Sequence, residues 1–245
     1  MKSGSILVAT DTWTSAFPDA VVGALVMRGV RNPEQSATLE IEKRRLEEGL
    51  RATGEGSTSG GAQAERASKA YVDYYRSRGK TYLVKAQRES VACKGKAIPS
   101  RAALVEAMFM AELKNLILTA GHDLDTIDGP LRVRVTAEGD LYVLLNGTEG
   151  VLEAGDMMMT DGVGIVSSVL RGPDQRTRIT SQTRNVLFAA YAPAGVGETL
   201  VRAHLEDIKT NVEFVAPTAQ TEELTTLTAV SGDRSSESSL PRDPS

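Results

Sequence analysis

The sequence is short of cysteine and histidine. Its single cysteine, Cys93, excludes an internal disulfide. Its two histidines, His122 and His204, lie far apart, and neither has a second histidine or cysteine at a spacing typical of metal ligands, so we predict no metal site and no cofactor. Residues 1–13 contain no apolar run long enough for a signal peptide or a membrane span. These absences lead us to expect a cytoplasmic protein with no membrane contact.

Two further absences concern chemistry and partners. The chain has no Gly-x-Ser-x-Gly motif and no Ser/His/Asp set that can be placed, which argues against covalent catalysis. It also lacks the basic excess of most nucleic-acid-binding domains, because 28 lysines and arginines face 32 aspartates and glutamates. Any contact with RNA must therefore use a local basic patch.

The residues that are present fit one globular domain. The chain has 245 residues, of which 41% are apolar and 24% are charged, enough for a sizeable core. Residues 218–245 are rich in serine, threonine and acids, and such a stretch buries too little apolar surface to offset the entropy of ordering. We therefore expect a folded domain over residues 1–217, close to neutral in charge, and a disordered acidic tail over residues 218–245.

Hydrophobic periodicity predicts the elements of the first half of the chain. Apolar runs indicate a buried strand, and apolar residues three and four apart indicate amphipathic helices. The longest helix is expected to have Ser100 as its N-cap and Gly121 at its end. The predicted elements are a strand at residues 19–31, helices at residues 34–53, 64–79 and 102–121, and a flexible Gly/Ser loop at residues 54–61.

Beyond residue 125 the apolar residues alternate with polar ones, which predicts short strands joined by turns. Strand and helix patterns do not alternate regularly, so we predict an α+β fold in which an antiparallel or mixed β layer packs with helices. The predicted strands are residues 131–135, 141–145, 156–161, 164–172, 177–183 and 185–193, and a last helix is predicted at residues 198–212.

A series of short motifs runs along residues 17–217. Their order and spacing resemble the B3/B4 domain family, the tRNA-editing domain of the phenylalanyl-tRNA synthetase β subunit, here in free-standing form. The motifs are Phe17-Pro18-Asp19 before a strand ending in Arg28-Gly29, Glu112-Leu113-Lys114-Asn115, the turn Asp123-Leu124-Asp125, the strand Leu131-Arg132-Val133-Arg134, and the closing pieces Gly155-Asp156, Asp161-Gly162, Arg176-Thr177 and Thr183-Arg184-Asn185.

The resemblance implies a protein that hydrolyses mischarged aminoacyl-tRNA, with the aminoacylated tRNA end and its amino-acid moiety as partners. Two positions depart from the family pattern, because the family's pocket histidine falls on Ala120 and its pocket glutamate on Ala189. The alternative is a non-catalytic B3/B4 module that binds an aminoacyl-tRNA end, an amino acid or a nucleoside. A third possibility is an enzyme that acts on a smaller substrate, such as an amino-acid ester.

His122 and Asp123 are the predicted catalytic residues. Ester hydrolysis needs a placed water and donors for the developing oxyanion, and a histidine near its working pH can orient or deprotonate that water. Asp123 can anchor an ammonium group or orient the histidine. The alternative is a partly exposed loop histidine beside an aspartate that caps the next turn.

Further side chains are predicted to bind the substrate. Asn115 lies on the apolar face of its helix, where a buried amide must find either backbone partners or a ligand. Glu112 can contact a ligand or face solvent. Arg134 alternates with apolar residues, which fits either the wet face of an edge strand or a phosphate contact. Arg176 and Thr177 lie on a basic stretch that can follow the phosphates of the tRNA acceptor end. Thr183 is expected, with Asn115, His122 and Asp123, in an amino-acid pocket between the middle helix and the β layer.

Overall fold

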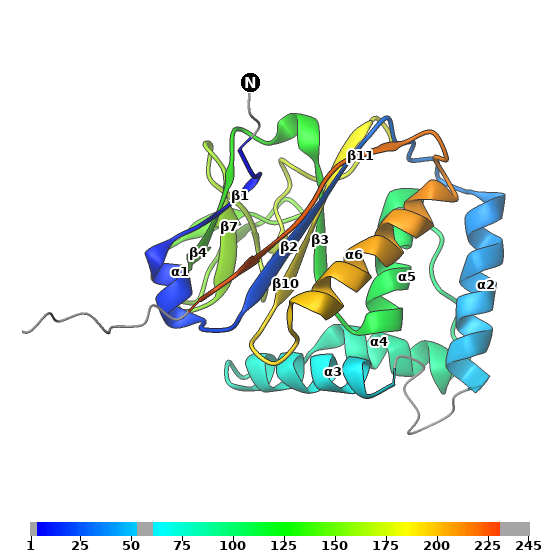
Figure 1. Cartoon of the computed structure of the whole chain (residues 1–245), viewed down its shortest axis with the longest axis horizontal. Coiled ribbons are helices and arrows are strands. Elements are labelled where there is room, and N and C mark those ends of the chain that lie inside the picture. The colour runs from blue at the N-terminus through cyan, green and yellow to red at the C-terminus, as the bar shows by residue number, and fades with distance from the viewer. Residues whose placement is uncertain (1–3, 53–60, 231–245) are drawn as a thin grey trace, which may run out of the picture.

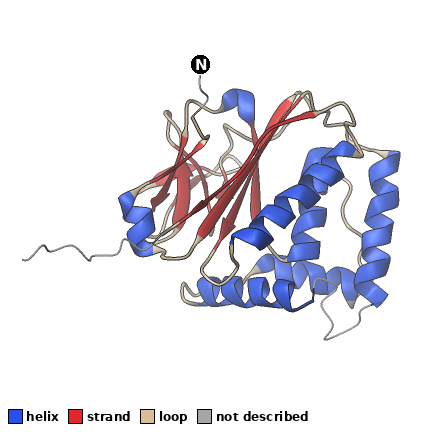
Figure 2. Cartoon of the chain, in the orientation of Figure 1, coloured by secondary structure: helices blue, strands red, loops and turns tan. Residues whose placement is uncertain are grey.

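The computed structural model describes residues 4–52 and 61–230 (Figure 1). It confirms the predicted α+β class. Helices α2 to α6 gather on one side of the molecule and the strands on the other (Figure 2). In chain order the elements are β1 (Leu7–Ala9), α1 (Asp11–Ala16), β2 (Val21–Arg28), α2 (Ala37–Ala52), α3 (Gly61–Arg76), α4 (Leu83–Ala92), α5 (Ala103–Asn115), β3 (Thr119–Asp123), a 3-10 turn (Leu124–Thr126), β4 (Leu131–Val135), β5 (Leu141–Val143), β6 (Glu149–Val151), β7 (Met157–Thr160), β8 (Ile165–Ser168), β9 (Gly172–Pro173), β10 (Asn185–Ala192), α6 (Glu198–Glu213) and β11 (Gln220–Thr228).

A four-stranded sheet in the order β11-β2-β10-β3, here called the central sheet, forms the middle of the molecule. Strands β2 and β10 pair antiparallel over their full length, and nearly all of their residues are buried. Both faces of these strands are covered, which explains their continuous apolar runs. Helix α6 packs so closely that a Cβ on Gly23 would lie 2.6 Å from Val201. The buried strand predicted at residues 19–31 is confirmed.

A second sheet in the order β1-β4-β7-β8-β9, here called the outer sheet, covers the other face of the central sheet. Tyr191 of β10 and Ser167 of β8 join the two sheets through a buried hydrogen bond between their hydroxyls. Arg132 and Arg134 are exposed on one face of β4, as their alternation with apolar residues predicts. However, β4 lies between β1 and β7, so the expected edge strand is wrong.

The predicted helix over residues 102–121 is too long. Helix α5 ends at Asn115 because Leu116 adopts a left-handed conformation with φ of 54°. The chain then forms β3, which pairs with β10 over residues 119–123. The pairing places β3 in the sheet despite the helix propensity of this stretch. Ala102, not Ser100, is the N-cap residue.

The acidic tail is only partly as expected. Residues 220–228 form β11, which pairs antiparallel with β2, so the disorder predicted from residue 218 is wrong for this stretch. Threonines favour strands, and pairing with a buried neighbour supplies the ordering that composition alone does not suggest. Residues 231–245 and 53–60 lie outside the described residues, and the latter include all of the predicted Gly/Ser loop except Gly61, the first residue of α3. The strand predicted at residues 177–183 is a loop, and helix α4 was not predicted.

Helix α2 is attached to the segment before α5 by a buried charge. The Lys43 side chain is 2% exposed, and its Nζ lies 2.9 Å from Glu106 Oε2 and 2.6 Å from Glu40 Oε1. Nζ also donates to Ser100 Oγ at 2.7 Å. A buried ammonium is tolerated here because every contact of its head group is with an oxygen atom.

Replacing Lys43 with Met should destabilise the protein by roughly 3–5 kcal/mol, because the buried Glu106 carboxylate loses its cation. Lys69→Met is the matched control, since Lys69 is 78% exposed and pairs with Asp73 one turn away. That change should cost less than about 1 kcal/mol. Urea unfolding of both variants measures the difference, and equal losses would contradict a structural role for the Lys43 cluster.

Candidate functional site

Strand β3 places His122 between the two sheets. Thr119 Oγ1 lies 2.7 Å from His204 Nε2 of α6, and a Cβ on Gly121 would lie 3.4 Å from Met108 of α5. Because side chains alternate along a strand, His122 points to the opposite face, toward the outer sheet. It is fully buried, so the expected partly exposed loop histidine at a helix exit is wrong.

Thr177 fixes the hydrogen-bonding state of His122. His122 Nδ1 lies 2.7 Å from Thr177 Oγ1, and the Thr177 hydroxyl donates to Asp174 Oδ1. A hydroxyl has one hydrogen, so Thr177 must accept from the Nδ1–H of His122. Nε2 is then the nitrogen with the free lone pair. It is buried and has no hydrogen-bond partner among the described residues.

The imidazole of His122 is held in its neutral form. Burial, followed by the charge of Arg176, lowers its pKa from 6.5 to about 4. The Nε2 lone pair is therefore free of a proton at neutral pH. A buried acceptor without a partner is uncommon, and it marks this position as a candidate site for a donor group or a reacting water.

Asp123 is bound to the surrounding backbone and to Thr183. The Thr183 hydroxyl donates to Asp123 Oδ2 at 2.7 Å, and Asp125 N–H donates to Oδ1 at 3.1 Å. Its own N–H donates to the Thr177 carbonyl at 2.7 Å. The carboxylate therefore caps the turn that follows β3, which is the alternative considered from the sequence, and it also attaches β3 to the loop that carries Thr177.

Arg176 is engaged within the protein. Its guanidinium lies 2.9 Å from Asp161 Oδ2 and 3.6 Å from Asp174 Oδ2, and it donates to the Thr126 carbonyl at 2.7 Å. These contacts position the loop beneath His122. Burial acts to raise the pKa of Asp161, but hydrogen bonds from the N–H groups of Asp128, Gly164 and Val163, followed by that from Arg176, hold it below its usual value. Arg176 thus supports the His122 cluster, defined here as His122, Asp123, Asp174, Arg176, Thr177 and Thr183.

Glu112 and Asn115 lie on the other side of the central sheet. Asn115 Nδ2 donates to Asp207 Oδ2 at 2.8 Å and lies 3.3 Å from His204 Nδ1. Glu112 Oε1 accepts the Thr119 N–H at 2.7 Å. Burial raises the pKa of Glu112 to about 8, although the Thr119 N–H opposes the shift. The predicted site residues therefore do not form one site, because the sheet separates Glu112 and Asn115 from His122.

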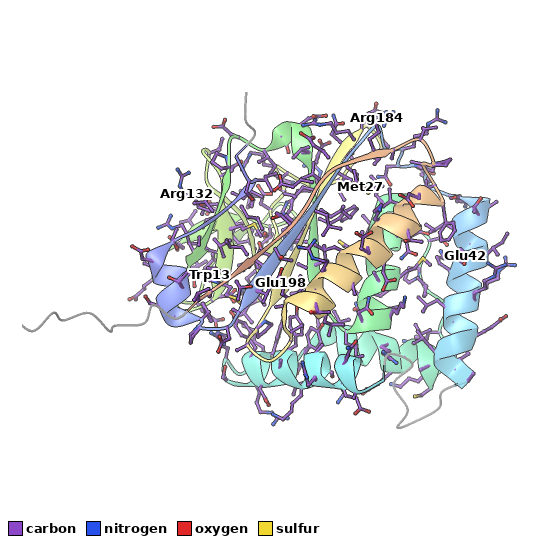
Figure 3. The ribbon with its side chains drawn as sticks, in the orientation of Figure 1. Trp13, Met27, Glu42, Arg132, Arg184 and Glu198 are labelled. Atoms are coloured by element: carbon purple, nitrogen blue, oxygen red, sulfur yellow. The ribbon has the colours of Figure 1, made fainter. Side chains whose placement is uncertain are left out.

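Arg134 belongs to neither group. It is exposed on the outer sheet, on the face that also carries Arg132, which Figure 3 labels on the far side of the molecule from α2. The two positions at which the resemblance predicts a departure from the family pattern are neighbours. Ala120 and Ala189 are register partners on β3 and β10, and both are buried. Their small side chains lie on the face of the central sheet that His122 shares.

A pocket of about 490 Å³ opens on the same side of the central sheet as His122. Its lining does not include any of the predicted site residues. Val26 of β2 lines the pocket. Leu187 of β10 pairs with Val26 on one side and with His122 of β3 on the other. The Val26 wall of the pocket and His122 therefore lie two strands apart. The pocket is lined by Gly4, Ser5, Ile6, Val8, Val26, Arg28, Leu124, Gly129, Pro130, Glu222 and Glu223.

The charged groups of this pocket were missed from the sequence. Arg28 forms an ion pair with Glu222, and Glu223 accepts hydrogen bonds from Ser5 Oγ and the Ile6 N–H. The two glutamates lie in the stretch that was predicted to be disordered. The sequence signal that could have predicted a strand here is the strand propensity of the threonines that follow the two glutamates. Within the described residues, no group of three or more potential ligands could hold a metal ion, and no helix is long and apolar enough to cross a membrane.

The family model described as "B3/4 domain" matches residues 94–229, which is more than half of the chain. The protein belongs to this family, and the resemblance drawn from the motifs is confirmed.

Two related proteins place this family in a named context. The phenylalanine–tRNA ligase β subunit of Xanthomonas euvesicatoria is 37% identical over 78 residues, which cover 30% of this chain and 10% of that protein. The crystal structure of an N-terminal fragment of the phenylalanyl-tRNA synthetase β subunit from Pyrococcus horikoshii is 12% identical, with a TM-score of 0.48, over 87% of this chain and half of that fragment. The match to the ligase subunit spans only 10% of that protein's length.

Three buried titratable groups predict how stability changes with pH. His122 and His204 have pKa values lowered by burial from 6.5 to about 4, so the unfolded chain gains protons first and stability is lost as pH falls from about 6.5 toward 4. Glu112 changes the stability in the opposite direction. Its pKa is raised from 4.5 to about 8, so stability is lost as pH rises through that range. Stability from these groups should therefore peak near pH 6.5.

Glu112→Gln tests the upper limb of this profile. Between about pH 7 and 8, Glu112 is the main group of the three whose proton binding differs between the folded and the unfolded chain, so wild-type stability should fall by up to about 1.4 kcal/mol per pH unit. The glutamine keeps an oxygen for the Thr119 N–H and has no proton to lose. Thermal unfolding should show a Tm that falls over this range in the wild type and stays level in the variant. Parallel slopes would show that Glu112 is ionised in the folded protein.

Proposed function

We propose that this protein binds the aminoacylated end of a tRNA in the cytoplasm and hydrolyses the ester of a mischarged amino acid. The observation that carries the proposal is the unpartnered, unprotonated Nε2 of His122 inside a B3/4 domain. The family supplies the substrate class, and the histidine supplies the base. No cofactor is needed, because water is the nucleophile.

In this reaction His122 Nε2 removes a proton from water as the water oxygen attacks the ester carbonyl carbon. The tetrahedral intermediate collapses by breaking the bond to the tRNA ribose oxygen, and the imidazolium returns the proton to that oxygen. Thr177 and Asp174 keep Nδ1 protonated and favour the charge that forms on the ring. Asp123 and Thr183 hold β3 and the Thr177 loop together.

The nearby pocket is our proposed entry for the amino-acid moiety. Its walls combine apolar side chains such as Val26 and Leu124 with the charges of Arg28 and Glu222. A carboxylate can bind the α-ammonium group, and a guanidinium can bind a phosphate. Two strand spacings, roughly 10 Å, separate the Val26 wall from His122. The substrate must therefore displace a covering side chain to bring its ester to Nε2.

A binding module is the second candidate. The complete burial of His122 and the replacement of both family pocket residues by Ala120 and Ala189 favour it. In this alternative, Nε2 accepts a hydrogen bond from a ligand donor and no bond is broken. The enzyme and the binding module are both expected to bind the aminoacylated tRNA end, but only the enzyme hydrolyses the ester.

Deacylation of a panel of mischarged and correctly charged tRNAs by the full chain tests the proposal. One mischarged species should be hydrolysed selectively. His122→Gln should slow this reaction by roughly 100-fold or more, because glutamine cannot take a proton. His204→Gln is the matched control: His204 is equally buried but lies on the other side of the central sheet, and its change should alter the rate by less than a few fold.

The pH dependence gives a second readout of the same step. With a pKa of about 4 for His122, the wild-type rate should not decline between pH 8 and pH 5 through protonation of this group. Equal activity of His122→Gln and the wild type would remove His122 from the mechanism. No hydrolysis of any tRNA in the panel would contradict the enzyme and leave the binding module, which a tRNA affinity measurement then tests.

A further inference from the structure

The β5–β6 hairpin adds a third layer outside the outer sheet. Tyr142 and Leu152 are buried and pack on Met158 of β7. Gly150 permits close packing within the hairpin, since a Cβ there would lie 2.9 Å from the Leu144 side chain. The inner face of the hairpin is therefore a small hydrophobic core of its own.

The outer face of the same hairpin is apolar too. Leu141, Val143, Leu145 and Val151 are 56%, 40%, 50% and 61% exposed, and we call them the hairpin patch. Leu141 and Val151 are direct cross-strand partners, so their side chains lie side by side. An antiparallel ribbon with one face buried usually places polar residues on the other face. A cluster of exposed apolar residues on it marks an interaction surface.

The exposed charged side chains on the hairpin itself are acidic. Residues 135–170 contain no lysine or arginine, whereas Glu138 and Glu149 are exposed on the hairpin and its entry turn. Glu149 pairs directly with Val143 and so completes the outer face of the ribbon. The nearby bases Lys80 and Arg171 both contact Glu153, whereas Glu138 and Glu149 form no ion pair among the described residues. The patch is thus an apolar surface beside two acids that have no cation partner within the described part of the chain.

We propose that the hairpin patch docks a protein segment whose apolar side chains are flanked by lysines or arginines. Glu138 and Glu149 repel RNA phosphates and anionic lipids and attract basic side chains, so a basic protein segment is the occupant that the charges favour. A second copy of this chain is disfavoured as well, because a symmetric contact would set Glu149 and its neighbours against the same acids of the partner. Docking at this surface does not depend on hydrolysis at His122.

The test measures binding of labelled peptides to the full chain by fluorescence anisotropy. One short peptide alternates leucine with lysine, a second replaces each lysine by glutamate, and a third replaces each leucine by serine. The leucine–lysine peptide should bind at least about tenfold more tightly than either of the others. Its affinity should fall with added salt, and Glu149→Gln should weaken it.

A double variant, Leu141→Thr with Val151→Thr, should reduce the affinity of this peptide by at least about tenfold, which corresponds to about 1.4 kcal/mol. The matched control makes the same two chemical changes at exposed sites elsewhere, Leu83→Thr with Val163→Thr, and should bind like the wild type. Threonine is favourable in strands, and circular dichroism checks that the hairpin variant folds. Unchanged binding by the hairpin variant, or equal binding of the serine–lysine peptide, overturns the proposal. So does a dimer in sedimentation that the hairpin changes dissociate.

Discussion

The antiparallel pairing of β2 with β10 is the constraint on which the other parts of this structure depend. Eight residues of each strand pair without a break, and both faces of the ribbon are covered. On one edge β10 pairs with β3, and on the other β2 pairs with β11. The pairing thereby fixes which residues of four strands face the helices and which face the outer sheet. A slip of one residue would reverse every one of these choices.

The register of β3 decides what His122 can do. On its present face the ring meets Thr177 and the space between the sheets, while Thr119 on the opposite face meets His204. Two buried histidines with similarly lowered pKa values thus have different surroundings. Both nitrogens of His204 have polar neighbours, whereas one nitrogen of His122 does not. The lowered pKa reflects burial in both cases, so only the missing partner distinguishes a candidate site from a structural histidine.

Much of this fold could be predicted from the sequence, because the local signals for most elements agree with the tertiary structure. The strand at residues 19–31, the helices near 34–53 and 198–212 and the inward position of Asn115 followed from periodicity. The failures share a cause. Residues 119–121 are predicted as the end of a helix and residues 220–228 as disordered, yet both belong to strands that pair with neighbours distant in sequence. The candidate site depends on those strands, so the grouping of Asn115 with His122 could not be corrected without the structure.

The near-neutral charge of the chain conceals a strong separation of charge along it. Arg132 and Arg134 precede a stretch of residues 135–170 without a single base, and Arg171 follows it. The hairpin acids repel polyanions that approach from their side, whereas the pocket carries Arg28 together with Glu222 and Glu223. Since Debye screening limits these effects to about 10 Å at moderate salt, local patches and not the net charge decide the approach. In the proposed function a tRNA end enters the pocket, which leaves the hairpin patch free for its own proposed ligand.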